Sequence, residues 1–98
     1  MNMQALMKQA QALQKDMTKA QSEIEKQEFE GESSVVKVKI NGKHEVLSVK
    51  IDLNSNLTSD DLEMLEDMIM IAMNNANKKA ENFKAEKLSK FGNIPGLL

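Results

Sequence analysis

The chain has 98 residues and a formal net charge of −2, and 41% of its residues are hydrophobic but only 3% aromatic. This length predicts one small domain or one subunit of an oligomer. The absence of cysteine excludes disulfide scaffolds, cysteine-ligated metal sites and thiol catalysis. With a single histidine as well, the sequence has few catalytic groups and predicts a protein that is not an enzyme. No apolar run approaches the roughly 20 residues of a membrane-spanning helix and no secretion signal is evident, so we expect a cytoplasmic protein without membrane association.

Residues 3–28 predict a long helix. Apolar residues recur there at alternating spacings of three and four, which forms a heptad seam made of Met3, Leu6, Ala10, Leu13, Met17, Ala20 and Ile24. At 1.5 Å per residue this helix would be about 39 Å long, more than the ~26 Å diameter of a compact domain of this size. The helix must therefore protrude or pack on a partner.

Residues 28–33 alternate only weakly and fit either a short strand or an irregular link. After them, the three apolar residues Val36, Val38 and Ile40 alternate with lysines and lead into Asn41-Gly42, a strong hairpin signal. A two-residue turn at this point would pair Ile40 with Lys43, Val38 with Glu45, Val36 with Leu47 and Ser34 with Val49. That register predicts one covered face made of Val36, Val38, Ile40, Leu47, Val49 and Ile51.

A second long helix is expected after the polar loop at residues 52–58. Thr58 or Ser59 is its predicted N-cap, acidic residues fill its first turn, and Gly92 ends it after about Phe91. The helix has two apolar stripes, so we expect it to contact both its own sheet and a second subunit. The predicted dimer interface is Leu62, Met64, Leu65, Met68, Ile69, Ile71, Ala72 and Met73. One domain over residues 1–91 and a flexible tail over 92–98 complete the expected organisation.

Charge is segregated along the chain. Residues 1–22 carry three lysines and one acid, residues 23–67 carry five lysines and twelve acids, and residues 68–98 carry five lysines and two acids. Because the first helix enters the sheet and the second leaves it, both basic segments can form arms on an acidic body. The candidate phosphate-binding residues are Lys8, Lys15, Lys19, Lys78, Lys79, Lys84, Lys87 and Lys90. A merely solvated outer helix face is the alternative interpretation. With no arginine, DNA contacts should favour the backbone over base edges.

The sequence predicts no metal, cofactor or small-molecule site. His44 follows the Asn-Gly turn without a second histidine or cysteine to complete a metal site, so we interpret it as an exposed turn residue. The acidic residues at the start of the second helix lack the alternating ligands and the glycine of a calcium loop. We interpret them as favourable partners of the helix dipole.

Five segments carry a resemblance to a known family: MKQAQ at residues 7–11, VKV at 36–38 with NG at 41–42, EVLSVKID at 45–52, EMLED at 63–67 and IPGL at 94–97. In their order and spacing the chain resembles, from end to end, the YbaB/EbfC family of small bacterial nucleoid-associated proteins. It departs from the common pattern at three points. Ser33-Ser34 replace a glycine-rich link, Leu53 replaces a frequent proline, and arginine is absent.

The resemblance implies an α+β subunit of the order α-β-β-β-α, in which residues 28–33 form the first strand of a three-stranded antiparallel sheet. It also implies a tweezer-like homodimer that binds double-stranded DNA in the nucleoid, alters its conformation and influences gene expression. The alternative is a prefoldin-like chaperone or protein-interaction module without DNA binding, because long heptad helices that flank a hairpin also describe such proteins. The end-to-end resemblance favours DNA binding.

Overall fold

The computed structural model describes residues 2–52 and 58–92. Its elements are α1 (Met3–Lys26), β1 (Glu28–Ser33), β2 (Val36–Asn41), β3 (Val46–Ile51) and α2 (Leu62–Leu88), with 3-10 turns at Ser59–Asp61 and Ser89–Phe91 on either side of α2. The predicted α-β-β-β-α fold is confirmed, and residues 28–33 form a strand rather than a link. The predicted tail beyond Gly92 lies outside the described residues.

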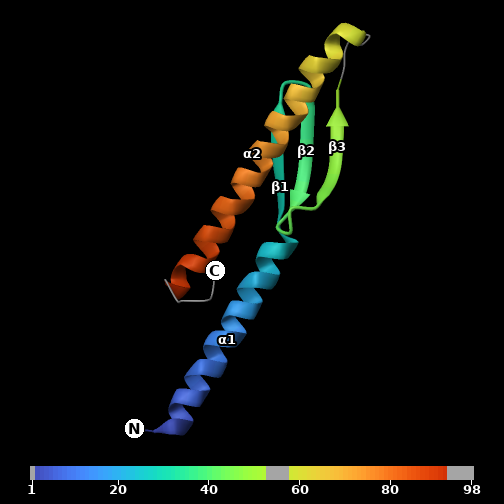
Figure 1. Ribbon diagram of the computed structural model, residues 1–98. Coiled ribbons are helices and arrows are strands. Elements are labelled where there is room, and N and C mark those ends of the chain that lie inside the picture. Colours follow the sequence, from blue (N-terminus) through green and yellow to red (C-terminus); the bar gives the residue numbers. More distant parts are fainter. Residues whose placement is uncertain (1, 53–57, 93–98) are drawn as a thin grey trace.

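The core lies between α2 and two strands of the sheet. The strands are antiparallel in the order β1-β2-β3, and α2 crosses the face of the sheet over β1 and β2 (Figure 1). The buried residues of this core are Phe29, Val36, Val38, Ile40, Ala72, Ala76 and Ala80. The small alanines allow the helix to approach the sheet closely, and a Cβ atom added to Gly31 would collide with the backbone of Ala72 and Ala76.

The helix α1 extends beyond this body, as its length predicted. Near its C-terminal end, Ala20 and Ile24 are buried against Leu88 and Phe91, which form a second small core. Its N-terminal part continues past the end of α2 (Figure 1). The molecule is therefore 72 Å long, with a radius of gyration of 19.8 Å, against about 13 Å for a compact domain of 100 residues.

The hairpin between β2 and β3 differs from the predicted two-residue turn. The backbone N–H of His44 donates to the carbonyl oxygen of Asn41 over 2.9 Å, so the turn spans Gly42 and Lys43. A two-residue Asn-Gly turn needs positive φ at both central residues, yet here the positive φ, 65°, belongs to His44. Gly42 instead serves a close approach, because a Cβ atom there would collide with the carbonyl group of Ile24 at the end of α1.

The predicted strand register is consequently wrong. Val38 pairs with Val49 and Val36 with Ile51, and the register shifts again between Lys39 and Ile40. The longer loop and this irregularity together move the partner of Val38 by four residues, from the predicted Glu45 to Val49. An even displacement preserves the faces of the strand, so Val49 and Ile51 still lie on the α2 side of the sheet.

The expected covering of β3 is also wrong. The side chains of Leu47 and Val49 are each 47% exposed and that of Ile51 is 40% exposed. The reason is the position of α2, which packs on β1 and β2 and leaves β3 uncovered within the chain.

The other face of the sheet is charged. Acidic side chains of β1 lie opposite lysines of β2, with Lys37 Nζ 3.1 Å from Glu32 Oε1 and Lys39 Nζ 3.6 Å from Glu28 Oε1. The hydrogen bond and the charge of Glu32 raise the pKa of Lys37 above its usual value. Exposed pairs of this kind contribute little to stability, and their opposite charges largely cancel along this face.

Candidate nucleic-acid interface

The first-helix lysines form a continuous row. Lys8, Lys15 and Lys19 are all exposed, and their heptad positions place them away from the apolar seam. Within the described residues none of the three forms an ion pair. Lys8 and Lys19 are separated by about 17 Å along the helix axis at 1.5 Å per residue. A duplex of that length carries about ten phosphates, so all three ammonium groups can reach phosphates of one DNA segment.

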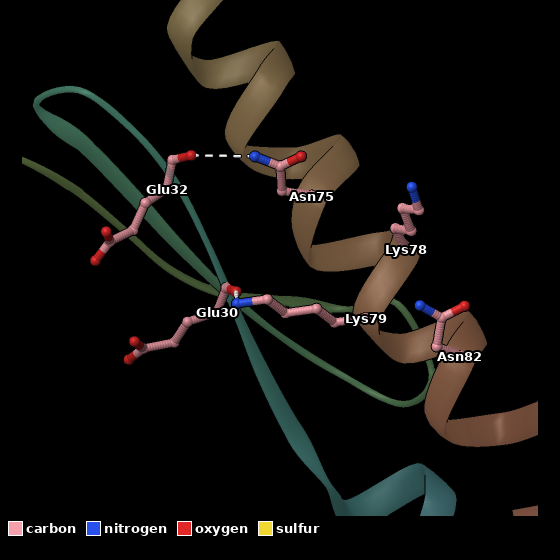
Figure 2. Close-up of a pocket in the computed structure, with 6 residues that line it drawn as sticks. All are labelled: Glu30, Glu32, Asn75, Lys78, Lys79 and Asn82. Carbon is pink, nitrogen blue, oxygen red and sulfur yellow. Dashed lines mark hydrogen bonds between the residues drawn. The ribbon is translucent and has the colours of Figure 1, made fainter. Parts of the chain in front are cut away.

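The lysines in the middle of α2 lie beside the free edge of β1. Lys79 Nζ donates to the carbonyl oxygen of Glu30 over 2.7 Å, and Asn75 Nδ2 donates to that of Glu32 over 3.2 Å (Figure 2). These two side chains satisfy outward-facing carbonyl groups of an edge strand. Figure 2 shows Lys78 pointing away from the strand. Lys79 is thus engaged in the fold, whereas Lys78 is directed to solvent.

The last lysines of α2 lie at its junction with α1. Lys87 Nζ is 3.3 Å from Glu23 Oε2 of α1 and 5.6 Å from the centre of the Phe83 ring. Lys90 Nζ is 5.2 Å from the centre of the Phe91 ring, and Lys84 is half-buried. Contacts with aromatic faces hold a lysine without neutralising it. Among the described residues, Lys87 is therefore paired with Glu23, whereas Lys84 and Lys90 form no ion pair.

The long axis of the molecule separates the charges. The acidic first turns of α2 lie at one end of the molecule, and the lysine row of α1 lies towards the other (Figure 1). The α2 lysines are divided between the sheet edge and the junction of the helices. The eight predicted lysines thus form one row of three and two further groups, of two and of three, rather than a single patch.

The predicted dimer-interface residues of α2 have three different environments. Ala72 is fully buried in its own chain. Leu65, Met68, Ile69 and Met73 are half-buried against the same core. Leu62, Met64 and Ile71 are exposed, as is their neighbour Met70.

Comparison with known proteins gives a family match over nearly the whole chain. The sequence model of the YbaB/EbfC DNA-binding family matches residues 1–94. The chain belongs to the YbaB/EbfC family. A relative from Ruminiclostridium cellulolyticum is 37% identical, and the match covers 98% of this chain and 88% of the relative. A relative from Alkaliphilus metalliredigens is 41% identical, with the same coverage of both chains. A relative from Ligilactobacillus salivarius is 40% identical, and the match covers 99% of this chain and 95% of the relative. All three are named nucleoid-associated protein.

Sequence reasoning missed two polar contacts of a single residue in this YbaB/EbfC chain. His44 is exposed, as expected, but its Nδ1 is 2.9 Å from Asn77 Oδ1 and its Nε2 is 3.1 Å from Glu81 Oε1. The ring therefore ties the β2–β3 turn to α2. Two polar residues four apart on a helix indicate a shared face, but no local pattern indicates that His44 lies opposite them.

Two negative findings apply to residues 2–52 and 58–92 of this family member. No group of three or more His, Cys, Asp or Glu side chains is arranged to hold a metal ion. Neither described helix is long and apolar enough to cross a membrane.

Proposed function

We propose that this protein is a nucleoid-associated protein that binds double-stranded DNA mainly through its phosphate backbone and alters DNA conformation. Membership of a DNA-binding family supports the class of ligand. The observation that carries the mechanism is the exposed row of Lys8, Lys15 and Lys19 on a helix that projects from the body. Lysine acts as a point charge towards phosphate, so the binding should be strong in low salt and weakly selective for sequence. An effect on gene expression would follow from the altered DNA conformation rather than from any catalysis.

We propose a ranking of the eight candidate lysines from their contacts. The first-helix row should contribute most, because its ammonium groups are exposed and outside ion pairs within the described residues. Lys78, Lys84 and Lys90 should add local positive charge. Lys79 and Lys87 should contribute least, because one binds a strand carbonyl and the other pairs with Glu23.

We also propose that the protein acts as a homodimer. An apolar surface, which we call the β3–α2 surface, remains exposed in the single chain and is made of Val46, Leu47, Val49 and Ile51 of β3 with Leu62 and Met70 of α2. Large exposed apolar patches typically mark interaction sites. A second copy is the expected occupant. Dimerisation would place two lysine-bearing arms on one particle and increase the number of phosphates it contacts.

The DNA proposal is tested by changing the lysine row and measuring the salt dependence of binding. In fluorescence anisotropy with a labelled ~30-bp duplex, replacing Lys8, Lys15 and Lys19 with glutamine should weaken binding similarly for unrelated sequences. The slope of log K against log salt should fall by about 0.9 for each phosphate that the variant no longer binds.

The matched control removes the same number of charges from the sheet. Glutamine at Lys37, Lys39 and Lys50 should leave both affinity and slope nearly unchanged, because these lysines lie on the charged sheet face away from the arm. Equal decreases in affinity for the two triple variants would show that net charge, rather than the row, determines binding. If the unaltered protein does not bind at low salt, a protein-interaction module becomes the better hypothesis.

A further inference from the structure

The heptad seam of α1 is covered over only part of its length. Towards the C-terminal end, Ala20 and Ile24 are buried against α2 and the turn after it. Towards the N-terminal end, Met3 is 68% exposed, Leu6 44% and Leu13 40%. A surface that is suited to helix packing therefore continues beyond its partner in the same chain. Its uncovered part, residues 3–16, is about 21 Å long at 1.5 Å per residue.

The uncovered seam has nearly the same spacing from either end. Its apolar positions, read outward from Ala10, are Leu6 and Leu13, then Met3 and Met17. Two α1 helices crossing antiparallel about a twofold axis at Ala10 would place Met3 against Met17, Leu6 against Leu13 and Ala10 against Ala10. Such an arrangement is the self-complementary interface that a symmetric pair requires. The small side chain at its centre would let the two backbones approach closely.

The length of the uncovered seam also fits this arrangement. With the axis at Ala10, the N-terminal Met3 of one helix reaches Met17 of the other, which is only half-buried beside the second small core, and stops before the fully buried Ala20. The bodies of the two molecules then lie at opposite ends of the pair. A parallel arrangement would instead bring both bodies to the same end, where α2 already occupies the seam.

The charges near the seam favour pairing of identical helices. The residues flanking it over the uncovered stretch are Met7, Gln9, Gln14 and Asp16. In the antiparallel arrangement Asp16 lies opposite the uncharged segment at residues 2–4, so no like charges meet. The lysine row is directed away from the seam, so its positive charges do not oppose the contact.

From these observations we propose that the α1 arms of two copies of this protein pair antiparallel through residues 3–17, centred on Ala10. This contact is separate from the β3–α2 surface, and it does not depend on DNA binding. It leaves Lys8, Lys15 and Lys19 on the outer sides of the helix pair. Two molecules joined in this way would present lysine rows in opposite directions.

Because the chain has no cysteine, single introduced cysteines test the arrangement directly. The full-length Ala10→Cys protein, at micromolar concentration under mild oxidation, should form a disulfide-linked pair at least tenfold faster than Ala12→Cys. Both positions are exposed on the same stretch of helix, but only position 10 lies in the seam, so Ala12→Cys measures random collision. Circular dichroism confirms that both variants retain the helix.

The direction of pairing is tested with cysteines at the two ends of the seam. Met3→Cys alone should link no faster than Ala12→Cys, whereas a mixture of Met3→Cys and Met17→Cys should give the mixed pair. Rapid linking of Met3→Cys to itself would indicate parallel helices and overturn the antiparallel arrangement. Equal rates for Ala10→Cys and Ala12→Cys would overturn the pairing altogether. Neither result depends on the outcome of the DNA-binding experiment, which reports on the lysines.

Discussion

At the scale of single residues, Gly31 determines how closely α2 approaches the sheet. A methyl group at this position would meet the backbone of Ala72 and Ala76, which cannot rotate away as a side chain can. Gly31→Ala should therefore lower the free energy of unfolding by about 2–3 kcal/mol, as overpacked cores do. Urea denaturation measures the change. Ser33→Ala, on the same strand, should change it by less than about 0.5 kcal/mol, and an equally mild effect at Gly31 would argue against the close approach.

His44 combines two separable contributions, one from its backbone and one from its ring. Its φ of 65° is unfavourable for a side-chain-bearing residue, and glycine would relieve this strain. Both His44→Ala and His44→Gly remove the contacts with Asn77 and Glu81. The alanine variant should be less stable than the glycine variant by about 1 kcal/mol in thermal or urea unfolding. Equal stabilities would indicate that the turn changes conformation when the ring is removed.

At the scale of elements, the free edge of β1 is protected by α2. Edge strands with open backbone groups can pair with other chains, and here Asn75 and Lys79 occupy the carbonyl groups of Glu32 and Glu30. Replacing them with alanine and methionine should cost about 0.5–1.5 kcal/mol for each hydrogen bond. It should also increase light scattering at high protein concentration.

Lys78 provides the control for that edge. Lys78→Met removes one positive charge, as the change at Lys79 does, but from the neighbouring side chain, which points away from the strand in Figure 2. It should change neither stability nor scattering appreciably. If it has the same effect as the double variant, then loss of charge rather than exposure of the strand edge causes the association.

At the scale of the whole molecule, the exposed β3–α2 surface predicts dimerisation. Val49→Asp places a charge on that surface and should lower the sedimentation coefficient, because the contact through this surface is lost and only the separate α1 contact remains. Ser48→Asp adds the same charge to the opposite face, since Ser48 pairs with Lys39, and should leave the dimer intact. A stable monomer in the unaltered protein at micromolar concentration would contradict the proposal.

Much of this fold was predictable because its signals are local. Each of these signals is formed by residues that are close together in the sequence: the heptad seam of α1, the alternation in β2 and the glycine that follows Phe91. The first helix, the second strand and the end of the second helix were accordingly found close to where they were expected. The register of β3 was not predictable in the same way. It depends on a left-handed residue at His44 and on the approach of α1 to Gly42, and neither is encoded in the alternation of the strand.

The candidate DNA-binding residues show the same division. Heptad position alone placed Lys8, Lys15 and Lys19 on one exposed side of a helix, because helical periodicity determines direction. It could not distinguish Lys78 from Lys79. Only the packing of α2 beside β1 brings Lys79 to the carbonyl oxygen of Glu30, while Lys78 remains in solvent.

The sequence by itself determined the order of the elements, the protruding first helix and the separation of charge, since these follow from periodicity and from position along the chain. The tertiary structure decided which apolar residues are covered. The helix α2 lies over β1 and β2, which leaves β3 exposed, and it reaches only the C-terminal part of α1, which leaves the N-terminal seam of α1 exposed. Burial depends on contacts between distant segments, so the exposure of β3 emerged only from the structure, whereas periodicity already indicated that both long helices could contact a partner.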